Sequence, residues 1–162
     1  MVCIAAIEDL PEIAGIYNQA IEARFQTCFT EPVSVKDKLQ WFYDHEETKF
    51  PLLVYKNDGR VGGWLSVSPY RQGRNALRYA VEISYFIDNA HLRQGIGSQL
   101  LARALVICRQ LGYKTALAVL IDSNTASIKL LEKYGFKEWG HLPAIADFDG
   151  RECGQYYYGL KL

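Results

Sequence analysis

Leu92–Ser98 has the sequence LRQGIGS and joins an apolar, β-rich run, Tyr79–Ile87, to a helical pattern that begins near Ile96. Because glycine has no Cβ, the backbone at Gly95 and Gly97 can approach a ligand closely. A tight turn that opens a helix also directs unpaired N–H groups and the positive end of the helix dipole toward one point. This geometry binds phosphate or pyrophosphate. Two glycines alone also fit an ordinary helix start, because short glycine motifs often match by chance.

The composition is that of one globular domain. The chain has 162 residues, enough to bury a core, and 22% of them are charged. There are 18 lysines and arginines and 18 aspartates and glutamates, so the formal net charge is zero. A neutral chain has no overall attraction for nucleic acid or for an anionic membrane. We therefore expect a single domain over residues 1–162 that has neither of these partners.

The cysteines and histidines do not form a metal-binding pattern. The four cysteines lie far apart without a CxxC pair, and the three histidines are equally scattered, so we expect no metal site. Reduced, mostly buried thiols are typical of a cytoplasmic protein. The N-terminus does not resemble a signal peptide, and no apolar run approaches the length of a membrane span. The expected location is the cytoplasm.

The N-terminal third of the chain predicts a strand and two helices. Residues 2–7 form a short apolar run. Asp9 and Glu12 resemble a capping box, and the apolar residues of 10–21 recur at helical spacing. A second helix is expected to begin at Ser34. The residues expected on its apolar face are Val35, Leu39, Phe42 and, less clearly, Trp41.

The rest of the chain alternates between strands and helices. Two strands, 51–55 and 61–67, flank the hairpin signal Asn57–Arg60, and a long strand follows at 79–87. After the glycine turn we expect a helix that Gly112 ends, a buried strand at 115–121, a helix at 124–134 and a closing pair of strands. The closing strands are expected at 136–142 and 155–160, around the turn Asp147–Gly150.

This order predicts an α/β fold with one mixed sheet. The glycine turn lies at the C-terminal end of a strand, where open α/β sheets bind ligands. The chain has neither the GxGxxG of a dinucleotide-binding start nor the GxxxxGK[ST] of a P-loop. These absences favour a pyrophosphate-bearing ligand other than a simple nucleotide.

Two motifs resemble those of the GCN5-related N-acetyltransferase (GNAT) family. Residues 92–97 occupy its acetyl-CoA motif Q/R-x-x-G-x-G/A. A second element, Asn-x-x-Ala/Ser-x-x-Leu followed by Gly-Phe, is matched by Asn124, Ser127, Leu130, Gly135 and Phe136. The match covers nearly the whole chain in the right order. The resemblance implies a mostly antiparallel sheet of six to seven strands flanked by about four helices, and acetyl-CoA as co-substrate.

Within the family, the chain is most similar to the phosphinothricin and methionine-sulfoximine acetyltransferases. Residues 29–32, 74–76, 82 and 124–136 carry that similarity. It implies direct transfer of an acetyl group to the primary amine of a small amino acid or analogue within a ternary complex, and a homodimer. The chain departs from the pattern at Leu92, at Leu131, where many relatives have a Tyr or His proposed as general acid, and in the C-terminal hairpin.

Glu82 is the predicted general base. Acyl transfer from a thioester needs a neutral amine, and a carboxylate near the sheet opening can take the proton. Glu82 lies within a β-rich run, where an unpartnered charge is costly to bury. Its alternative is a solvated side chain paired with Arg71 or Arg78, and the family resemblance favours the base.

The remaining candidates divide into donor-binding and acceptor-binding residues. A backbone N–H near Phe86 or Ile87 is expected to stabilise the oxyanion. Arg74 and Arg78 are expected to bind a substrate carboxylate, although solvated loop cations are the alternative. The predicted donor-binding residues are Phe86, Ile87, Arg93, Gln94, Gly95, Ile96, Gly97, Ser98 and Asn124. A CoA-binding module without catalysis and an acetyltransferase of protein or peptide N-termini are the alternative functions.

Overall fold

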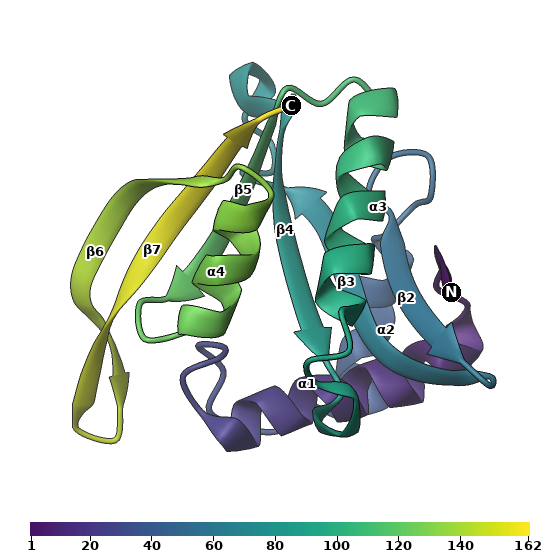
Figure 1. The fold of residues 1–162 in the computed structure, drawn as a ribbon, viewed down its shortest axis with the longest axis horizontal. Helices are drawn as coiled ribbons and strands as arrows, with labels where there is room; N and C mark the ends of the chain where they lie inside the picture. The colour runs from purple at the N-terminus through teal and green to yellow at the C-terminus, as the bar shows by residue number, and fades with distance from the viewer.

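The computed structural model describes residues 1–162 as a single sheet with helices on both faces (Figure 1). Three short 3-10 turns, Ile7–Asp9, Asn75–Leu77 and Asn89–His91, lie between the main elements. In chain order the main elements are β1 (Val2–Ile4), α1 (Leu10–Ala23), α2 (Val35–Tyr43), β2 (Leu52–Asn57), β3 (Arg60–Pro69), β4 (Ala80–Ile87), α3 (Ile96–Gln110), β5 (Thr115–Ile121), α4 (Thr125–Lys133), β6 (Lys137–Phe148) and β7 (Arg151–Lys161).

The sheet has seven strands in the order β1-β2-β3-β4-β5-β7-β6. Every neighbouring pair is antiparallel except β4 and β5, which are parallel. The connection between these two parallel strands contains α3, as a parallel pair requires a crossover. The fold is therefore the predicted mixed, mostly antiparallel sheet with four helices.

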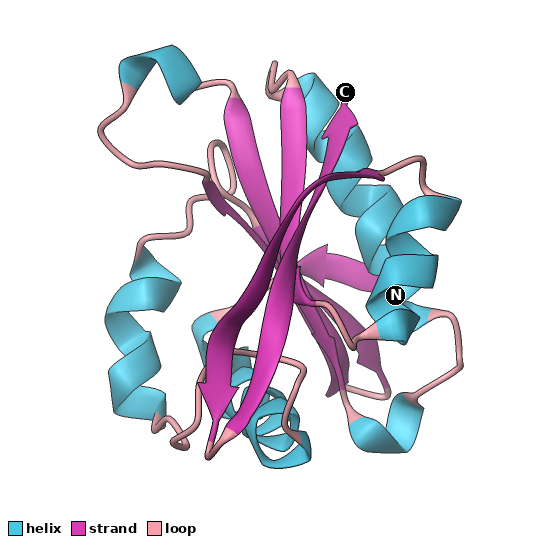
Figure 2. Cartoon of the chain, turned by 90° about the vertical axis from the view of Figure 1, so that its left-hand side faces the viewer, coloured by secondary structure: helices cyan, strands magenta, loops and turns pink.

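Two apolar clusters hold the helices to opposite faces of the sheet, and Figure 2 shows the strands in the middle with helices on either side. The larger cluster joins α3 and Leu131 of α4 to one face, with Leu100 and Leu101 fully buried. The smaller cluster joins α1 to the other face through Ile13, Ile16 and Trp64. No helix is both long enough and apolar enough to cross a membrane.

Gly95 and Gly97, at the start of α3, are required for different structural reasons. Gly95, at the N-cap of α3, has a φ of +77°, in the left-handed region that side chains with a Cβ adopt at a cost. Gly97 lies in the first turn, where an added Cβ would be 2.9 Å from Cδ2 of Leu130. One glycine therefore shapes the turn, and the other allows α3 to pack closely on α4.

The N-terminal capping box predicted at Asp9 and Glu12 is wrong. The Asp9 carboxylate accepts a hydrogen bond from the Ala6 N–H (2.9 Å) and pairs with Lys56 Nζ (2.7 Å). Glu12 accepts from the Val61 N–H (2.8 Å) instead of its own helix. Both acids therefore tie α1 to the β2–β3 hairpin. The first strand is also shorter than predicted, and the last two strands are longer.

Helix α2 begins as predicted, with its inward face shifted. The Ser34 hydroxyl accepts from the Asp37 N–H (3.2 Å), and the Ser34 N–H donates to the Asp37 carboxylate (2.8 Å). However, Val35 and Leu39 are exposed by 41% and 39%, so they do not form the packing face. The half-buried side chains of the helix include Lys38, Trp41 and Phe42. The charged side chain of Lys38 thus lies on the inward face, where the apolar pattern does not predict it.

Candidate active site

The site lies where β4 and β5 separate. The two strands pair only at Ala80–Thr115, Val81–Ala116 and Glu82–Leu117. Beyond Glu82, β4 continues to Ile87 beside β3 but without β5, and Figure 1 shows the two strands diverging. This part of β4 has lost its neighbour on the β5 side, so backbone groups there are open to a ligand.

Two cavities meet at this separation. The larger has a volume of about 510 Å³ and lies toward α3 and α4, and the smaller, of about 370 Å³, lies toward α1 and α2. Five residues line both cavities: Gln26, Ser84, Phe86, Val119 and Leu120. A molecule in one cavity can therefore reach a molecule in the other.

The larger cavity contains nearly all of the predicted donor-binding residues. Gln94 is the exception, because its side chain donates to the Ala90 carbonyl (3.3 Å) and does not line the cavity. Its expected role in donor binding is therefore not supported for the side chain. The predicted residues that line the cavity are Phe86, Ile87, Arg93, Gly95, Ile96, Gly97, Ser98 and Asn124.

The turn before α3 has the geometry of an anion site. Arg93 and Gly95 both have positive φ, +62° and +77°, and the first turn of α3 follows at once. The N–H groups of a first helical turn have no partner within the helix and carry the positive end of its dipole. Asn124 caps the next helix, since its Oδ1 accepts from the Ser127 N–H (3.2 Å).

On its α4 side, the larger cavity has no proton-donating side chain at position 131, because that residue is a leucine. Leu131 is 1% exposed and belongs to the core. Tyr134, at the end of α4, donates its hydroxyl to the Ser98 carbonyl (2.8 Å) and so ties α4 to α3. The phenol that lines the cavity is that of Tyr85, which accepts from the Ser127 hydroxyl (2.9 Å). Burial raises the pKa of Tyr85 to about 12, so this phenol stays neutral.

Glu82 lines the smaller cavity as a half-buried carboxylate. It forms neither an ion pair nor a hydrogen bond with another side chain, so the alternative pair with Arg71 or Arg78 is not formed in this structure. Burial raises the pKa of the Glu82 carboxyl, and the charge of Arg71 offsets part of that rise. A carboxylate with a raised pKa and no protein partner is suited to accept a proton.

The two arginines predicted to bind the substrate lie elsewhere in this chain. Arg74 and Arg78 are exposed, and neither lines the cavity. The Arg78 guanidinium donates to the Asn75 carbonyl (2.9 Å) and lies 4.4 Å from the centre of the Tyr79 ring. The structure therefore does not place either arginine in the cavity that Glu82 lines.

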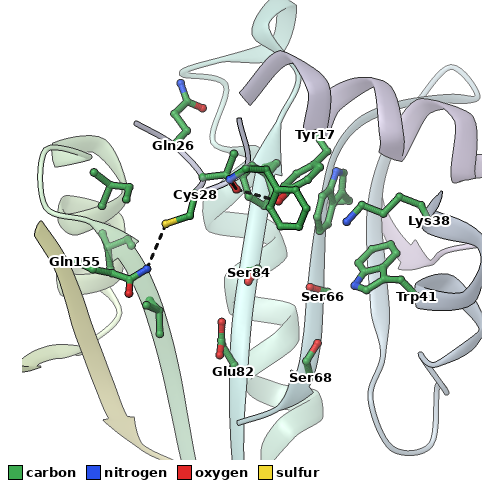
Figure 3. A pocket seen from close by; sticks show the side chains of 17 residues that line it. Tyr17, Gln26, Cys28, Lys38, Trp41, Ser66, Ser68, Glu82, Ser84 and Gln155 are labelled. Carbon is green, nitrogen blue, oxygen red and sulfur yellow. Dashed lines mark hydrogen bonds between the residues drawn. The ribbon is translucent and has the colours of Figure 1, made fainter. Parts of the chain in front are cut away.

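An aromatic wall with one cation faces Glu82 instead. Tyr17 from α1, Trp41 from α2 and Trp64 from β3 line the cavity, and Lys38 lies between the first two (Figure 3). The Lys38 Nζ is 4.2 Å from the centre of the Tyr17 ring and 4.5 Å from that of the Trp41 ring. Burial lowers the pKa of Lys38. In the sequence, Tyr17 fits the apolar spacing of residues 10–21 and Trp41 the expected apolar face of the second helix, so neither indicates a cavity wall.

A row of hydroxyl groups forms the part of the cavity between the wall and Glu82. Ser68 is the cross-strand neighbour of Glu82, and Ser66 is the neighbour of Ser84. His45 reaches this row from the end of α2: its Nε2 lies 3.3 Å from the Ser68 hydroxyl. The His45 Nδ1 lies 2.6 Å from the Trp41 carbonyl, which must accept its proton. In neutral His45 the Nε2 is therefore an acceptor, and Ser68 donates to it.

The segment after α1 completes the cavity. The Tyr17 hydroxyl and the Thr27 hydroxyl are hydrogen-bonded at 2.9 Å. Gln155 of β7 donates its amide to the Cys28 sulfur (3.5 Å), as the dashed line in Figure 3 shows. Cys28, Phe29 and Gln155 thus help to enclose a space that is also lined by α1, α2, β3, β4 and β5.

The comparisons with known proteins agree with this geometry. The family model of the acetyltransferase (GNAT) family matches residues 15–136. YwnH of Bacillus subtilis, provisionally named a phosphinothricin acetyltransferase, is 39% identical over 160 residues, 98% of this chain and 94% of that protein. An L-methionine sulfoximine/L-methionine sulfone acetyltransferase of Pseudomonas aeruginosa is 30% identical over 159 residues, 98% of this chain and 92% of that protein.

A solved structure has the same fold with the donor bound. The phosphinothricin acetyltransferase of Sinorhizobium meliloti in complex with acetyl-CoA matches 100% of this chain and 88% of its own, with a TM-score of 0.95 and 26% identity. The chain therefore belongs to the acetyltransferase (GNAT) family. It is an enzyme of the acetyltransferase class.

Proposed function

We propose that this enzyme transfers the acetyl group of acetyl-CoA to the primary amine of a small amino acid or analogue, directly and within a ternary complex. The carrying observation is Glu82, a half-buried carboxylate without a protein partner, in a cavity that meets the donor cavity where β4 and β5 separate. The substrates named for the relatives, methionine sulfoximine, methionine sulfone and phosphinothricin, support an amino-acid acceptor.

The larger cavity is the proposed acetyl-CoA site. The turn from Arg93 through Ser98 would hold the pyrophosphate through backbone N–H groups and the helix dipole. The pantetheine arm would lie along the separated part of β4, with Asn124 at its other side. The acetyl-CoA complex of the Sinorhizobium meliloti relative, which has the same fold, supports this assignment.

The smaller cavity is the proposed acceptor site, with Glu82 as the base. An ammonium group has no lone pair, so it must lose a proton before its nitrogen can attack the thioester carbonyl. Glu82 would take that proton, directly or through water. The new C–N bond then forms, the C–S bond breaks, and CoA leaves as a thiolate. The nitrogen loses its second proton as the amide forms, and this proton neutralises the thiolate.

The backbone near Phe86 and Ile87 is the proposed oxyanion donor. Negative charge develops on the thioester oxygen as the amine attacks, and a fixed N–H dipole stabilises it. Phe86 lines both cavities and lies on the part of β4 that β5 leaves open. Only its backbone is used, so a side-chain substitution at this position would change packing more than chemistry.

The assembly and location are also proposals. Residues 1–162 would act as one acetyltransferase domain, and two copies would form a homodimer. Three large apolar side chains of the edge strand β6, Trp139, Leu142 and Ile145, are exposed and support a partner surface. The four cysteines are unpaired, which fits a reducing compartment such as the cytoplasm.

A thiol-release assay with acetyl-CoA and a panel of amines tests the proposed function. Turnover is expected with methionine sulfone, methionine sulfoximine and phosphinothricin. Saturable binding of CoA without turnover on any amine would instead indicate a binding module. Acetylation of peptides but not of free amino acids would indicate an acetyltransferase of protein N-termini.

A further inference from the structure

The acceptor cavity contains two unpaired charges of opposite sign. Of the residues that line it, only Lys38 and Glu82 carry a charge at neutral pH. Both side chains are half-buried, and neither has an oppositely charged group within ion-pair distance. Figure 3 shows them on opposite sides of the cavity, each directed into it. A partly buried charge without a partner is unfavourable, so the cavity is suited to a ligand that supplies both missing charges.

The aromatic wall holds the cation in place. The rings of Tyr17 and Trp41, over which the Lys38 ammonium lies, both pack against Trp64, with ring centres 6.0 Å and 5.5 Å apart. The hydrogen bond between Tyr17 and Thr27 fixes the first of these rings further. Aromatic faces attract a cation but accept no proton from it. The three N–H donors of Lys38 therefore remain available to an acid group.

We infer that Lys38 binds the carboxylate of the acceptor amino acid, while Glu82 on the opposite side receives its amine. This inference rests on the proposed function and names the residue that selects its substrate class. An α-amino acid is a zwitterion, so its two charges complement the two charges of the cavity. A simple amine would complement Glu82 only and would leave Lys38 unpaired.

Other cations are less suited to this role. Arg74 and Arg78 do not line the cavity, and Arg78 already donates to the Asn75 carbonyl. Arg71 is near enough to lower the pKa of Glu82, but it is exposed and also lies outside the lining. Lys38 is the cation that the fold places inside the cavity.

The test compares two acceptors in three forms of the enzyme. The acceptors are methionine sulfone and its α-carboxamide, which keeps the amine and the side chain but has no carboxylate. The enzymes are the wild type, Lys38→Met, which keeps most of the length of the side chain without the charge, and Lys38→Arg, which keeps the charge. Lys36→Met, an exposed lysine of the same helix, is the matched control.

We expect Lys38→Met to weaken binding of the acceptor that has a carboxylate and to affect the carboxamide little. Lys38→Met should raise the KM for methionine sulfone about 10- to 100-fold, the range for loss of hydrogen bonds to a charged group. It should leave the KM for acetyl-CoA unchanged and change the KM for the carboxamide less than about 3-fold. Comparing the two acceptors within each variant cancels their difference in amine basicity. Lys38→Arg should restore most of the selectivity, and Lys36→Met should equal the wild type.

In the kinetic test, two outcomes would overturn the inference. One is equal use of the acid and the carboxamide by the wild type, and the other is an equal loss on both acceptors in Lys38→Met, as a merely structural role predicts. If the wild type acetylates no amine, the proposed function fails, and the fluorescence of Trp41 and Trp64 still tests Lys38. Methionine sulfone added with CoA should then change the emission of the wild type, and Lys38→Met should weaken that binding. If Lys38→Met is half-saturated at the same concentration of methionine sulfone as the wild type, the inference is wrong.

Discussion

The donor and acceptor cavities meet at Phe86 and differ in how the chain builds them. The donor cavity uses one continuous turn, Leu92–Ser98, the open backbone of β4 and the start of α4. The acceptor cavity takes side chains from α1, the segment after it, α2, β3, β4, β5 and β7. Backbone groups in a turn require a local conformation, whereas a wall of side chains requires the whole fold. The donor half can therefore be recognised from a motif, and the acceptor half cannot.

Substitutions in the donor cavity and in the acceptor cavity should also have separate kinetic effects. Substitutions on the acceptor side should alter turnover or the KM for the amine, and substitutions at the glycine turn should alter the KM for acetyl-CoA. A variant that changes both equally would contradict the division.

Glu82→Gln should lower kcat/KM for the amine about 100- to 1,000-fold at neutral pH, because the amide cannot accept a proton. Burial raises the pKa of Glu82, and the base works only when ionised. Activity of the wild type should therefore fall as the pH drops through a value above the ordinary glutamate range, and the variant should lack that limb. Stopped-flow binding of acetyl-CoA is the control and should be unchanged. Full activity in the variant would remove Glu82 from the reaction.

Gly95→Ala should raise the KM for acetyl-CoA about 5- to 30-fold, since a left-handed φ costs about 1–2 kcal/mol for a residue with a Cβ. The turn can lower that cost only by changing the conformation that binds pyrophosphate. Gly59→Ala is the matched control: Gly59 has a φ of +79°, and it lies in the β2–β3 hairpin, outside both cavities. Steady-state kinetics should show no rise in KM for this control. Equal rises in both variants would indicate a general loss of stability.

His45→Gln should reduce kcat about 3- to 10-fold, the range for losing one neutral hydrogen bond, and leave the KM for acetyl-CoA unchanged. The physical reason is that His45 orients the Ser68 hydroxyl beside Glu82. Burial lowers the pKa of His45, while the Trp41 carbonyl and Asp44 act in the opposite direction. Its ring should therefore titrate below the ordinary histidine value, which NMR of the ring nitrogens can measure. A midpoint at or above that value would contradict a neutral acceptor at Nε2.

Arg78→Ala should change the KM for the amine by less than about 2-fold, the usual range for an exposed substitution. The guanidinium is bonded to the Asn75 carbonyl and does not line the acceptor cavity. Lys38→Met, measured in the same assay, provides the comparison. A tenfold rise in KM for Arg78→Ala would restore the arginine as a substrate anchor.

Local patterns predicted most of the fold. The strand at Thr115–Ile121 and the helix start at Ile96 lie where the sequence pattern placed them, because a buried strand and a glycine turn have signatures of a few residues. The pairing of Asp9 with Lys56 was not predictable. In the sequence, a carboxylate such as Asp9 near a helix start predicts an N-terminal cap. Its pairing with Lys56 depends on where the neighbouring β2–β3 hairpin lies in the fold.

The sequence by itself determined the family, the donor turn and Glu82 as the candidate base, since each depends on neighbouring residues or on a motif in the right order. The tertiary structure alone decided which side chains face the acceptor. It turned Lys38 inward and left Leu39 exposed, and it kept Arg74 and Arg78 out of the cavity. The physical reason is that the packing of α2 on α1 and the sheet sets the rotation of the helix. A rotation of the helix by one residue position is enough to place Lys38, and not Leu39, on the inward face.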